Sequence, residues 1–192
     1  MKILEAPVLE KTYTVEEYFE LEKYAEIRHE YYYGKLIPMP GESKNANRIA
    51  GNCEYKFRQQ LEDKGLDFFH SDIRLQVKEG GIYRYPDFVI TPVVDDSHTH
   101  HIKQPVLTLE VPSDESERRD RVTKRDEYLG MPTLQCYLII SQYEPHVDVY
   151  LRDEKGWRIY SFKKMEDEIF FSFLGAKLRV ADIYKGIVFE QA

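Results

Sequence analysis

Apolar positions recur with a helical period in two stretches of the first third of the chain. Residues 14–17 fit a capping box, in which the Thr hydroxyl and the second Glu carboxylate satisfy opposite backbone donors. A helix is therefore predicted over residues 15–25, and its apolar face would carry Tyr18, Leu21 and Ala25. A second helix is predicted over residues 46–64. Its apolar stripe consists of Ile49, Cys53, Phe57 and Leu61.

The pattern then becomes that of strands. An aromatic and apolar segment at residues 31–39, centred on Gly34 and Lys35, predicts a tight hairpin. Residues 73–77 alternate between apolar and polar, and the run at 83–91, interrupted by a proline, predicts a further strand. Fifteen Tyr and ten Phe also favour strands over a bundle of helices.

Two runs, Val106–Val111 and Leu134–Ile140, are almost entirely apolar, as expected of strands that are covered on both faces. A charged segment between them predicts a helix from about Glu115 to Leu129. A strand, a helix and a strand in this order form a right-handed crossover by default, so we expect a parallel pair within a mixed sheet. Further short strands are expected at residues 147–151, 157–162 and 168–173.

The composition is that of a folded domain. The chain has 192 residues, 42% of them hydrophobic, which is enough for a core and predicts one domain over residues 1–192. Lys and Arg number 27 and Asp and Glu number 34, giving a net charge of −7. This net negative charge excludes a general polycation that coats nucleic acid. It does not exclude an acidic protein with one local basic cleft.

Cysteine usage and hydropathy bear on the compartment. Cys53 and Cys136 form neither a CxxC motif nor a zinc spacing, so we expect two buried free thiols in a reducing compartment. No stretch approaches the roughly 20 apolar residues of a membrane span, and residues 1–10 do not resemble a signal peptide. The expectation is a soluble, cytoplasmic protein.

Several common catalytic motifs are absent from the sequence. It contains no G-x-S-x-G elbow, no P-loop and no G-x-G-x-x-G after a strand. A polar stretch with three His and two Asp residues suggests either a metal site or a solvated loop, and the loop is the favoured interpretation. These residues are Asp95, Asp96, His98, His100 and His101.

Two carboxylates occupy apolar strand positions. Asp87 precedes Phe88-Val89-Ile90, and Glu110 closes the run that begins at Val106. Burying a carboxylate is costly unless it is paired or binds a cation. Carboxylate oxygens suit Mg²⁺, which takes one or two of them and keeps its other positions for water and phosphate. Spacing alone leaves open the alternative that both side chains lie at strand ends in solvent.

The order of these motifs resembles a known family. Tyr85–Ile90, then Leu109-Glu110-Val111, then Asp120-Arg121-x-x-Lys124-x-x-x-Tyr128 resemble the Uma-type family of bacterial restriction endonucleases, within the PD-(D/E)XK nuclease superfamily. The likeness extends over roughly residues 12–187. It also includes Arg28–Tyr31 with Gly34, residues 47–52 and 71–74, Pro132–Gln135 and Trp157.

The resemblance implies an α/β (α+β) fold, namely a restriction-endonuclease-like mixed β-sheet flanked by helices, with extra C-terminal antiparallel strands. It implies that Asp87 and Glu110 bind the metal, Mg²⁺ with Mn²⁺ as a substitute. Lys124 would be the superfamily's catalytic lysine, moved from the strand onto the following helix, and Glu30 an additional catalytic acid. Asp87, Glu110, Lys124 and Glu30 are thus the candidate catalytic residues.

Two positions depart from the family pattern, and several residues have a structural alternative. Pro112 stands at the superfamily's usual lysine position and Cys136 at a position often acidic. Glu30 alternatively pairs at the surface with Arg28 or Lys35, and Lys124 is alternatively an exposed partner of Asp120. For Tyr128 packing is favoured over a phosphate contact. Residues 115–128 carry five basic and five acidic side chains, so Arg118, Arg121 and Arg125 either face phosphate or belong to a self-neutralised helix.

Two hypotheses of function follow. The first is a Mg²⁺-dependent endonuclease that hydrolyses phosphodiester bonds in nucleic acid, with DNA as the expected substrate and a homodimer as the expected assembly. The second is a catalytically inactive nuclease-fold protein that binds nucleic acid or a protein partner. The residues Asp87, Glu110 and Lys124 favour the enzyme, whereas Pro112, Cys136 and the net charge of −7 favour the binding module.

Overall fold

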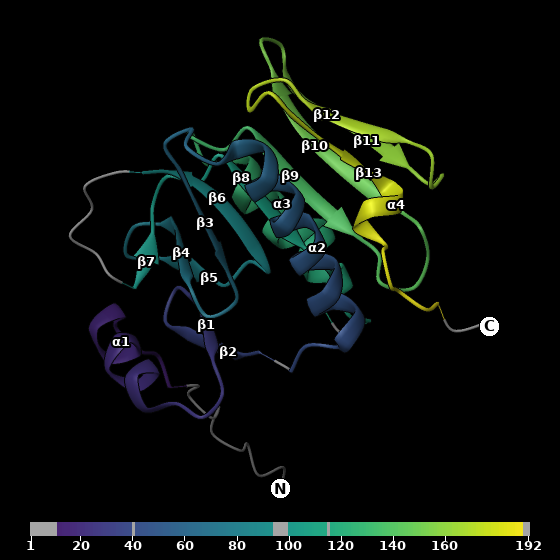
Figure 1. The fold of residues 1–192 in the computed structure, drawn as a ribbon. Coiled ribbons are helices and arrows are strands. Elements are labelled where there is room, and N and C mark those ends of the chain that lie inside the picture. Colours follow the sequence, from purple (N-terminus) through teal and green to yellow (C-terminus); the bar gives the residue numbers. More distant parts are fainter. Residues whose placement is uncertain (1–10, 40, 94–99, 115, 190–192) are drawn as a thin grey trace, which may run out of the picture.

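A six-stranded sheet lies at the centre of the protein (Figure 1). The computed structural model describes residues 11–39, 41–93, 100–114 and 116–189. The strand order in this sheet is β11-β10-β9-β8-β6-β3, and only the pair β8–β9 is parallel. The strands are β3 (Leu66–His70), β6 (Phe88–Pro92), β8 (Leu107–Glu110), β9 (Cys136–Ile140), β10 (Val147–Asp153) and β11 (Gly156–Phe162).

A smaller sheet packs beside it with the order β2-β1-β5-β4-β7. Its strands are β1 (His29–Tyr32), β2 (Lys35–Pro38), β4 (Arg74–Lys78), β5 (Ile82–Arg84) and β7 (His101–Ile102). The predicted hairpin is present as β1–β2. Its turn residues Tyr33 and Gly34 both have positive φ, 43° and 89°, as a type I′ turn requires.

Helix α2 (Lys44–Leu61) covers one face of the six-stranded sheet, together with the hairpin β12 (Glu168–Phe171)–β13 (Ala176–Arg179) and helix α4 (Val180–Ile183). Ser43 caps α2, and the predicted apolar stripe is confirmed, because all four of its side chains are fully buried. Among them is Cys53, which like Cys136 is a buried free thiol, as expected.

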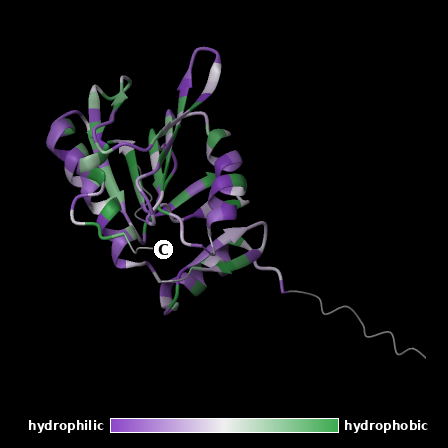
Figure 2. Cartoon of the chain, turned by 90° about the vertical axis from the view of Figure 1, so that its right-hand side faces the viewer, coloured by the Kyte–Doolittle hydropathy of each residue, from purple (hydrophilic) through white to green (hydrophobic). Residues whose placement is uncertain are grey.

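Helix α3 (Arg125–Leu129) covers the opposite face, where Val89, Tyr128 and Tyr137 belong to a second core cluster. Alternation along the strands separates the two faces: Phe88 packs toward α2, whereas its neighbour Val89 packs toward α3. In Figure 2 the apolar residues concentrate in the strands between the two helical layers. The predicted crossover is confirmed, since β8 and β9 are parallel and joined through α3.

The structure corrects the crossover helix in one respect. Its middle is the π-helical segment η1 (Arg119–Lys124) rather than a regular α-helix. A π-helical turn inserts an extra residue, changes which side chains face the sheet, and is frequent at functional sites. Glu115, where the helix was expected to begin, lies outside the described residues.

The predicted strand over residues 83–91 is wrong as a single element. It is two strands, β5 and β6, which belong to different sheets. The chain crosses between the sheets at Tyr85-Pro86-Asp87, where proline has no N–H to donate to a sheet ladder. Strands β3, β7 and β13 and helix α4 were not predicted, because their short or mixed patterns lack a clear period.

Helix α1 (Val15–Tyr24) begins with the predicted capping box at Thr14. Its buried face consists of Tyr18 and Glu22, whereas Leu21 is 45% exposed, so the predicted apolar face is wrong at that position. Tyr18 packs against two tyrosines of the smaller sheet, which selects the face that α1 buries. Within the described residues, no helix is long and apolar enough to cross a membrane.

Candidate active site

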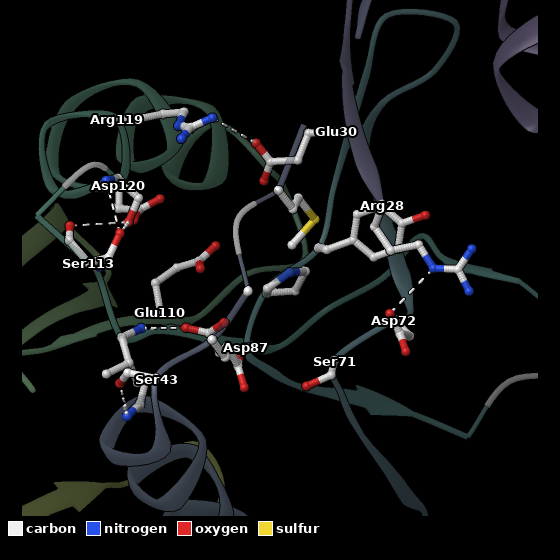
Figure 3. A pocket seen from close by; sticks show the side chains of 18 of the residues that line it. Arg28, Glu30, Ser43, Ser71, Asp72, Asp87, Glu110, Ser113, Arg119 and Asp120 are labelled. Carbon is white, nitrogen blue, oxygen red and sulfur yellow. Dashed lines mark hydrogen bonds and ion pairs between the residues drawn. The ribbon is translucent and has the colours of Figure 1, made fainter. Parts of the chain in front are cut away.

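The acidic residues singled out from the sequence meet in a cavity of about 510 Å³ where the two sheets and the crossover helix adjoin (Figure 3). Glu30 comes from β1, and Asp87 comes from the segment that crosses between the sheets. Glu110 is the last residue of β8, and η1 contributes Asp120 and Lys124. The four candidate catalytic residues therefore line one cavity. Their roles in a reaction stay predictions.

Asp87 and Glu110 oppose each other across two strands. Phe88 pairs with Leu109, and continuing this antiparallel register sets Asp87 opposite Glu110. The backbone N–H of Val111 donates to Asp87 Oδ2 at 2.6 Å, which fixes that side chain against the end of β8. Both carboxylates lie on the α3 face, because Phe88 and Leu109 occupy the α2 face.

Burial and mutual repulsion disfavour two negative charges here. Burial, and next the charge of Glu110, raises the pKa of Asp87 well above its usual value. Burial also raises the pKa of Glu110 to about 8, against the lowering effect of Lys124. Without further positive charge the pair therefore retains a proton at neutral pH. Glu110 is 3% exposed, so the alternative of carboxylates in solvent is wrong for it.

Lys124 lies inside a ring of three carboxylates. Its Nζ is 3.0 Å from Glu110 Oε1, Glu30 Oε1 and Asp120 Oδ1. Glu30 Oε1 and Asp120 Oδ1 accept no hydrogen bond among the described residues, so the ion pairs with Lys124 are the compensating contacts of these two atoms. Burial opposes the charge of the lysine, but the surrounding acids outweigh it and raise its pKa well above the usual value. Lys124 is 5% exposed, which overturns the alternative of an exposed lysine.

Glu30 is held by cations rather than exposed at the surface. Arg84 donates from Nη1 to Glu30 Oε2 at 2.9 Å, and Arg119 lies 3.8 Å from the same oxygen. Figure 3 shows the Arg119 side chain directed at Glu30. Although burial opposes it, the charges of Lys124 and Arg84 lower the pKa of Glu30. Glu30 is 2% exposed, so the alternative of a surface acid is wrong.

Arg84, the arginine that binds Glu30 and the crossover helix, was not singled out from the sequence. Arg84 is 1% exposed and binds Glu127 of α3 through two hydrogen bonds of 2.8 and 2.7 Å, besides its contact with Glu30. It thus ties the smaller sheet to the crossover helix. A signal was present, because Arg84 interrupts an aromatic strand just as Asp87 interrupts an apolar one.

Tyr128 is a packing residue, as favoured, and is fully buried. Its hydroxyl also donates to Glu110 Oε1 at 2.9 Å, a contact that was not predicted.

The interpretation of the helix charges as self-neutralised holds for Arg121 and Arg125. Arg121 pairs with Glu117 and Asp148 and Arg125 pairs with Asp126, and neither arginine lines the cavity.

The two departures from the family pattern have structural roles. The carbonyl of Pro112 accepts a hydrogen bond from Gln142 Nε2 at 2.7 Å, and Gln142 in turn accepts one from the Ser43 hydroxyl that caps α2. Cys136 is fully buried in the core beneath α2. Neither position supplies a charged group to the cavity.

A divalent cation fits the chemistry of Asp87 and Glu110. Both offer hard oxygen ligands, and a bound cation would offset the burial that raises the pKa of each carboxyl. No group of three His, Cys, Asp or Glu side chains within the described part of the chain is arranged to hold a metal ion. A cation here would therefore take two protein carboxylates and draw its remaining ligands from water or substrate. Asp95, Asp96 and His98 of the polar stretch lie outside the described residues.

Comparison with protein families identifies the chain. The family model Uma2, described as "Putative restriction endonuclease", matches residues 15–181. The chain belongs to the Uma2 family. Two relatives from Synechocystis sp. (strain ATCC 27184 / PCC 6803 / Kazusa), both described as uncharacterized proteins, are 31% identical to it. One match spans 176 residues, 91% of this chain and 92% of the relative, and the other 168 residues, 85% and 95%.

A solved structure supports the architecture of this Uma2 protein. The crystal structure of "a putative nuclease belonging to DUF820" from Anabaena variabilis ATCC 29413 matches with a TM-score of 0.72 and 19% identity. The match covers 92% of this chain and 99% of that chain. At this identity the likeness establishes the fold, and it confirms the predicted class of mixed sheet flanked by helices.

Proposed function

We propose that this Uma2 protein is a Mg²⁺-dependent endonuclease that hydrolyses phosphodiester bonds in DNA. The observation that carries the proposal is the pair Asp87 and Glu110, opposed across β6 and β8 in the floor of a cavity, with the Lys124 ammonium 3.0 Å from Glu110. Membership in a restriction endonuclease family makes nucleic acid the expected substrate.

In this proposal Asp87 and Glu110 hold the cation, with Mn²⁺ able to replace Mg²⁺. A bound divalent cation lowers the pKa of water and neutralises charge on a phosphate. Lys124 then stabilises the negative charge that grows on a non-bridging phosphate oxygen, a contribution of about 10²–10³ in rate for comparable electrostatic donors. Glu30 orients the ammonium from the opposite side, and Arg84 fixes Glu30.

Asp120 and Tyr128 complete the positioning of these groups. Asp120 lies one turn before Lys124 and contacts its ammonium, whereas Tyr128 donates to the Glu110 oxygen that also contacts Lys124. These two contacts restrain the orientation of Glu110, which would hold the cation. We further propose that the protein acts in the cytoplasm as a homodimer, and light scattering that detects only monomer at micromolar concentration would refute the dimer.

One observation favours a second candidate, a binding module without catalysis. Lys124 already contacts three carboxylates, so a phosphate must compete for its charge. In this candidate the ring is structural, and the protein binds nucleic acid or a protein partner without cutting.

A nicking assay on supercoiled plasmid separates the two candidates. The enzyme hypothesis expects nicking with Mg²⁺ or Mn²⁺ and none with EDTA, and it expects Asp87→Asn and Glu110→Gln to lose activity. The matched control Glu62→Gln removes an exposed carboxylate just after α2 and should cut like the wild type. Inactivity of the wild type on double-stranded DNA, single-stranded DNA and RNA would establish the binding module instead. Calorimetry on Asp87→Asn should detect no Mg²⁺ binding.

A further inference from the structure

A second cavity of about 530 Å³ adjoins the candidate active site. The two cavities share Arg28, Asp72 and Tyr85 in their linings. Tyr85 is two residues before Asp87, on the segment where the chain crosses from one sheet to the other. The two cavities are therefore contiguous at the segment that leads to Asp87.

Arg74 of β4 lines the second cavity and is held rigidly by aromatic rings. Its guanidinium carbon lies 4.5 Å from the centre of the Phe19 ring and 5.6 Å from that of Tyr18. This stacking restrains the side chain. Its Nη1 atom is buried and has no hydrogen-bond partner, a costly state for a charged donor.

The acids that line this cavity already have ion-pair or hydrogen-bond partners. Glu20 pairs with Lys23, and Asp72 pairs with Arg28 at 3.4 Å. Glu22 is 3% exposed and accepts hydrogen bonds from the His29 backbone N–H and from the Tyr85 hydroxyl. Arg74 differs from the other cations here, because it contacts two aromatic rings and forms no ion pair with an acid within the described part of the chain.

We propose that Arg74, assisted by Arg28, binds a backbone phosphate of the substrate strand next to the one that is cut. A phosphodiester supplies an anion for Arg74, which forms no ion pair among the described residues and whose Nη1 has no acceptor there. Arg28 is suited to the assisting role because it lines both cavities. Its Nη1 donates a hydrogen bond to the backbone carbonyl of Glu22 at 2.8 Å, which positions the side chain. The site contacts a phosphate and no base. It therefore contributes to the affinity for nucleic acid and to the position of the strand, but not to sequence specificity. This inference rests on the proposed function, since it assumes a nucleic-acid substrate.

The salt dependence of binding tests the subsite. The affinity of the wild type, Arg74→Gln and Arg74→Lys for a labelled single-stranded oligonucleotide is measured over a range of salt concentrations. Parallel series contain EDTA or Ca²⁺, and gels check that the strand stays intact. Loss of one phosphate contact should lower the slope of log K against log salt by about 0.7 for Arg74→Gln. Arg74→Lys keeps the charge and should keep the slope.

Arg58→Gln is the matched control, because Arg58 also stacks on an aromatic ring, that of Phe68 at 4.9 Å, but lines neither cavity. Its slope should equal that of the wild type. Thermal unfolding verifies that each variant is folded. Should Arg74→Gln not fold, Arg28→Gln takes its place, because that side chain is 40% exposed, and the same loss of slope is expected.

The outcomes separate the subsite from the proposed function. If the wild type binds or cuts nucleic acid but the folded variants keep its slope, the subsite is wrong and the function stands. An equal loss of slope in Arg58→Gln also refutes the subsite, since it would show a general effect of net charge. A wild type that neither binds nor cuts any nucleic acid overturns both.

Discussion

Replacing Lys124 by Met removes the one cation that three buried carboxylates share. At 3.0 Å and an effective dielectric constant of 20, each ion pair contributes about 5–6 kcal/mol of Coulomb energy. Burying the ions costs several kcal/mol for each of them. The net effect of removing one partner of such a buried group is a loss of about 3–5 kcal/mol in the free energy of unfolding. For a chain of this length that lowers Tm by about 6–20 °C.

The loss should depend on pH. Lys124 stays charged throughout, because the acids raise its pKa above an already high ordinary value. In Lys124→Met the carboxylates lose this compensation, so their pKa values rise, and protonation relieves the repulsion as the pH falls. A group whose pKa is raised by folding takes up protons more readily in the folded state, so stability increases toward low pH. The difference in Tm between wild type and variant is therefore larger at pH 8 than at pH 5.

Calorimetric or optical melting at both pH values measures this directly. Lys177→Met is the matched control, because Lys177 pairs with Glu168 at 2.9 Å while both side chains are partly exposed, at 50% and 34%. That pair should contribute less than about 1 kcal/mol. A Tm loss in Lys124→Met no larger than in the control, or equal at both pH values, would refute the reasoning.

Three further predictions follow from the same geometry. Mg²⁺ affinity should rise as the pH increases from 6 to about 8, because Glu110, with a pKa of about 8, must release its proton, and calorimetry in buffers of different ionisation enthalpy should detect that release. A pH-independent affinity would contradict it. Arg84→Met should lower the free energy of unfolding by about 3–5 kcal/mol, because Glu30 and Glu127 lose their buried partner, and urea titration measures the change. A thiol reagent should label neither Cys53 nor Cys136 in the native protein and both in denaturant, because burial raises the pKa of each thiol.

The sequence by itself determined the elements whose pattern is strong and local. The stripe of α2, the capping box of α1, the β1–β2 turn and the parallel pair β8–β9 all follow from periodicity or turn chemistry. The cost of burying a carboxylate also singled out Asp87 and Glu110 without any knowledge of the fold. These features depend on near neighbours in the chain, which a sequence displays directly.

Only the tertiary structure decided how charge is distributed at the site. Lys124, Glu30 and Arg84 come from three different elements, and their burial depends on how the smaller sheet packs against the crossover helix. The sequence of the charged segment, with equal numbers of acidic and basic residues, does not show that the turn contributing Lys124 is π-helical. The break at Pro86, which sends β5 and β6 into separate sheets, likewise depends on contacts made by distant strands. Long-range packing decides such features, because the same local sequence is compatible with exposed and buried states that differ by only a few kcal/mol.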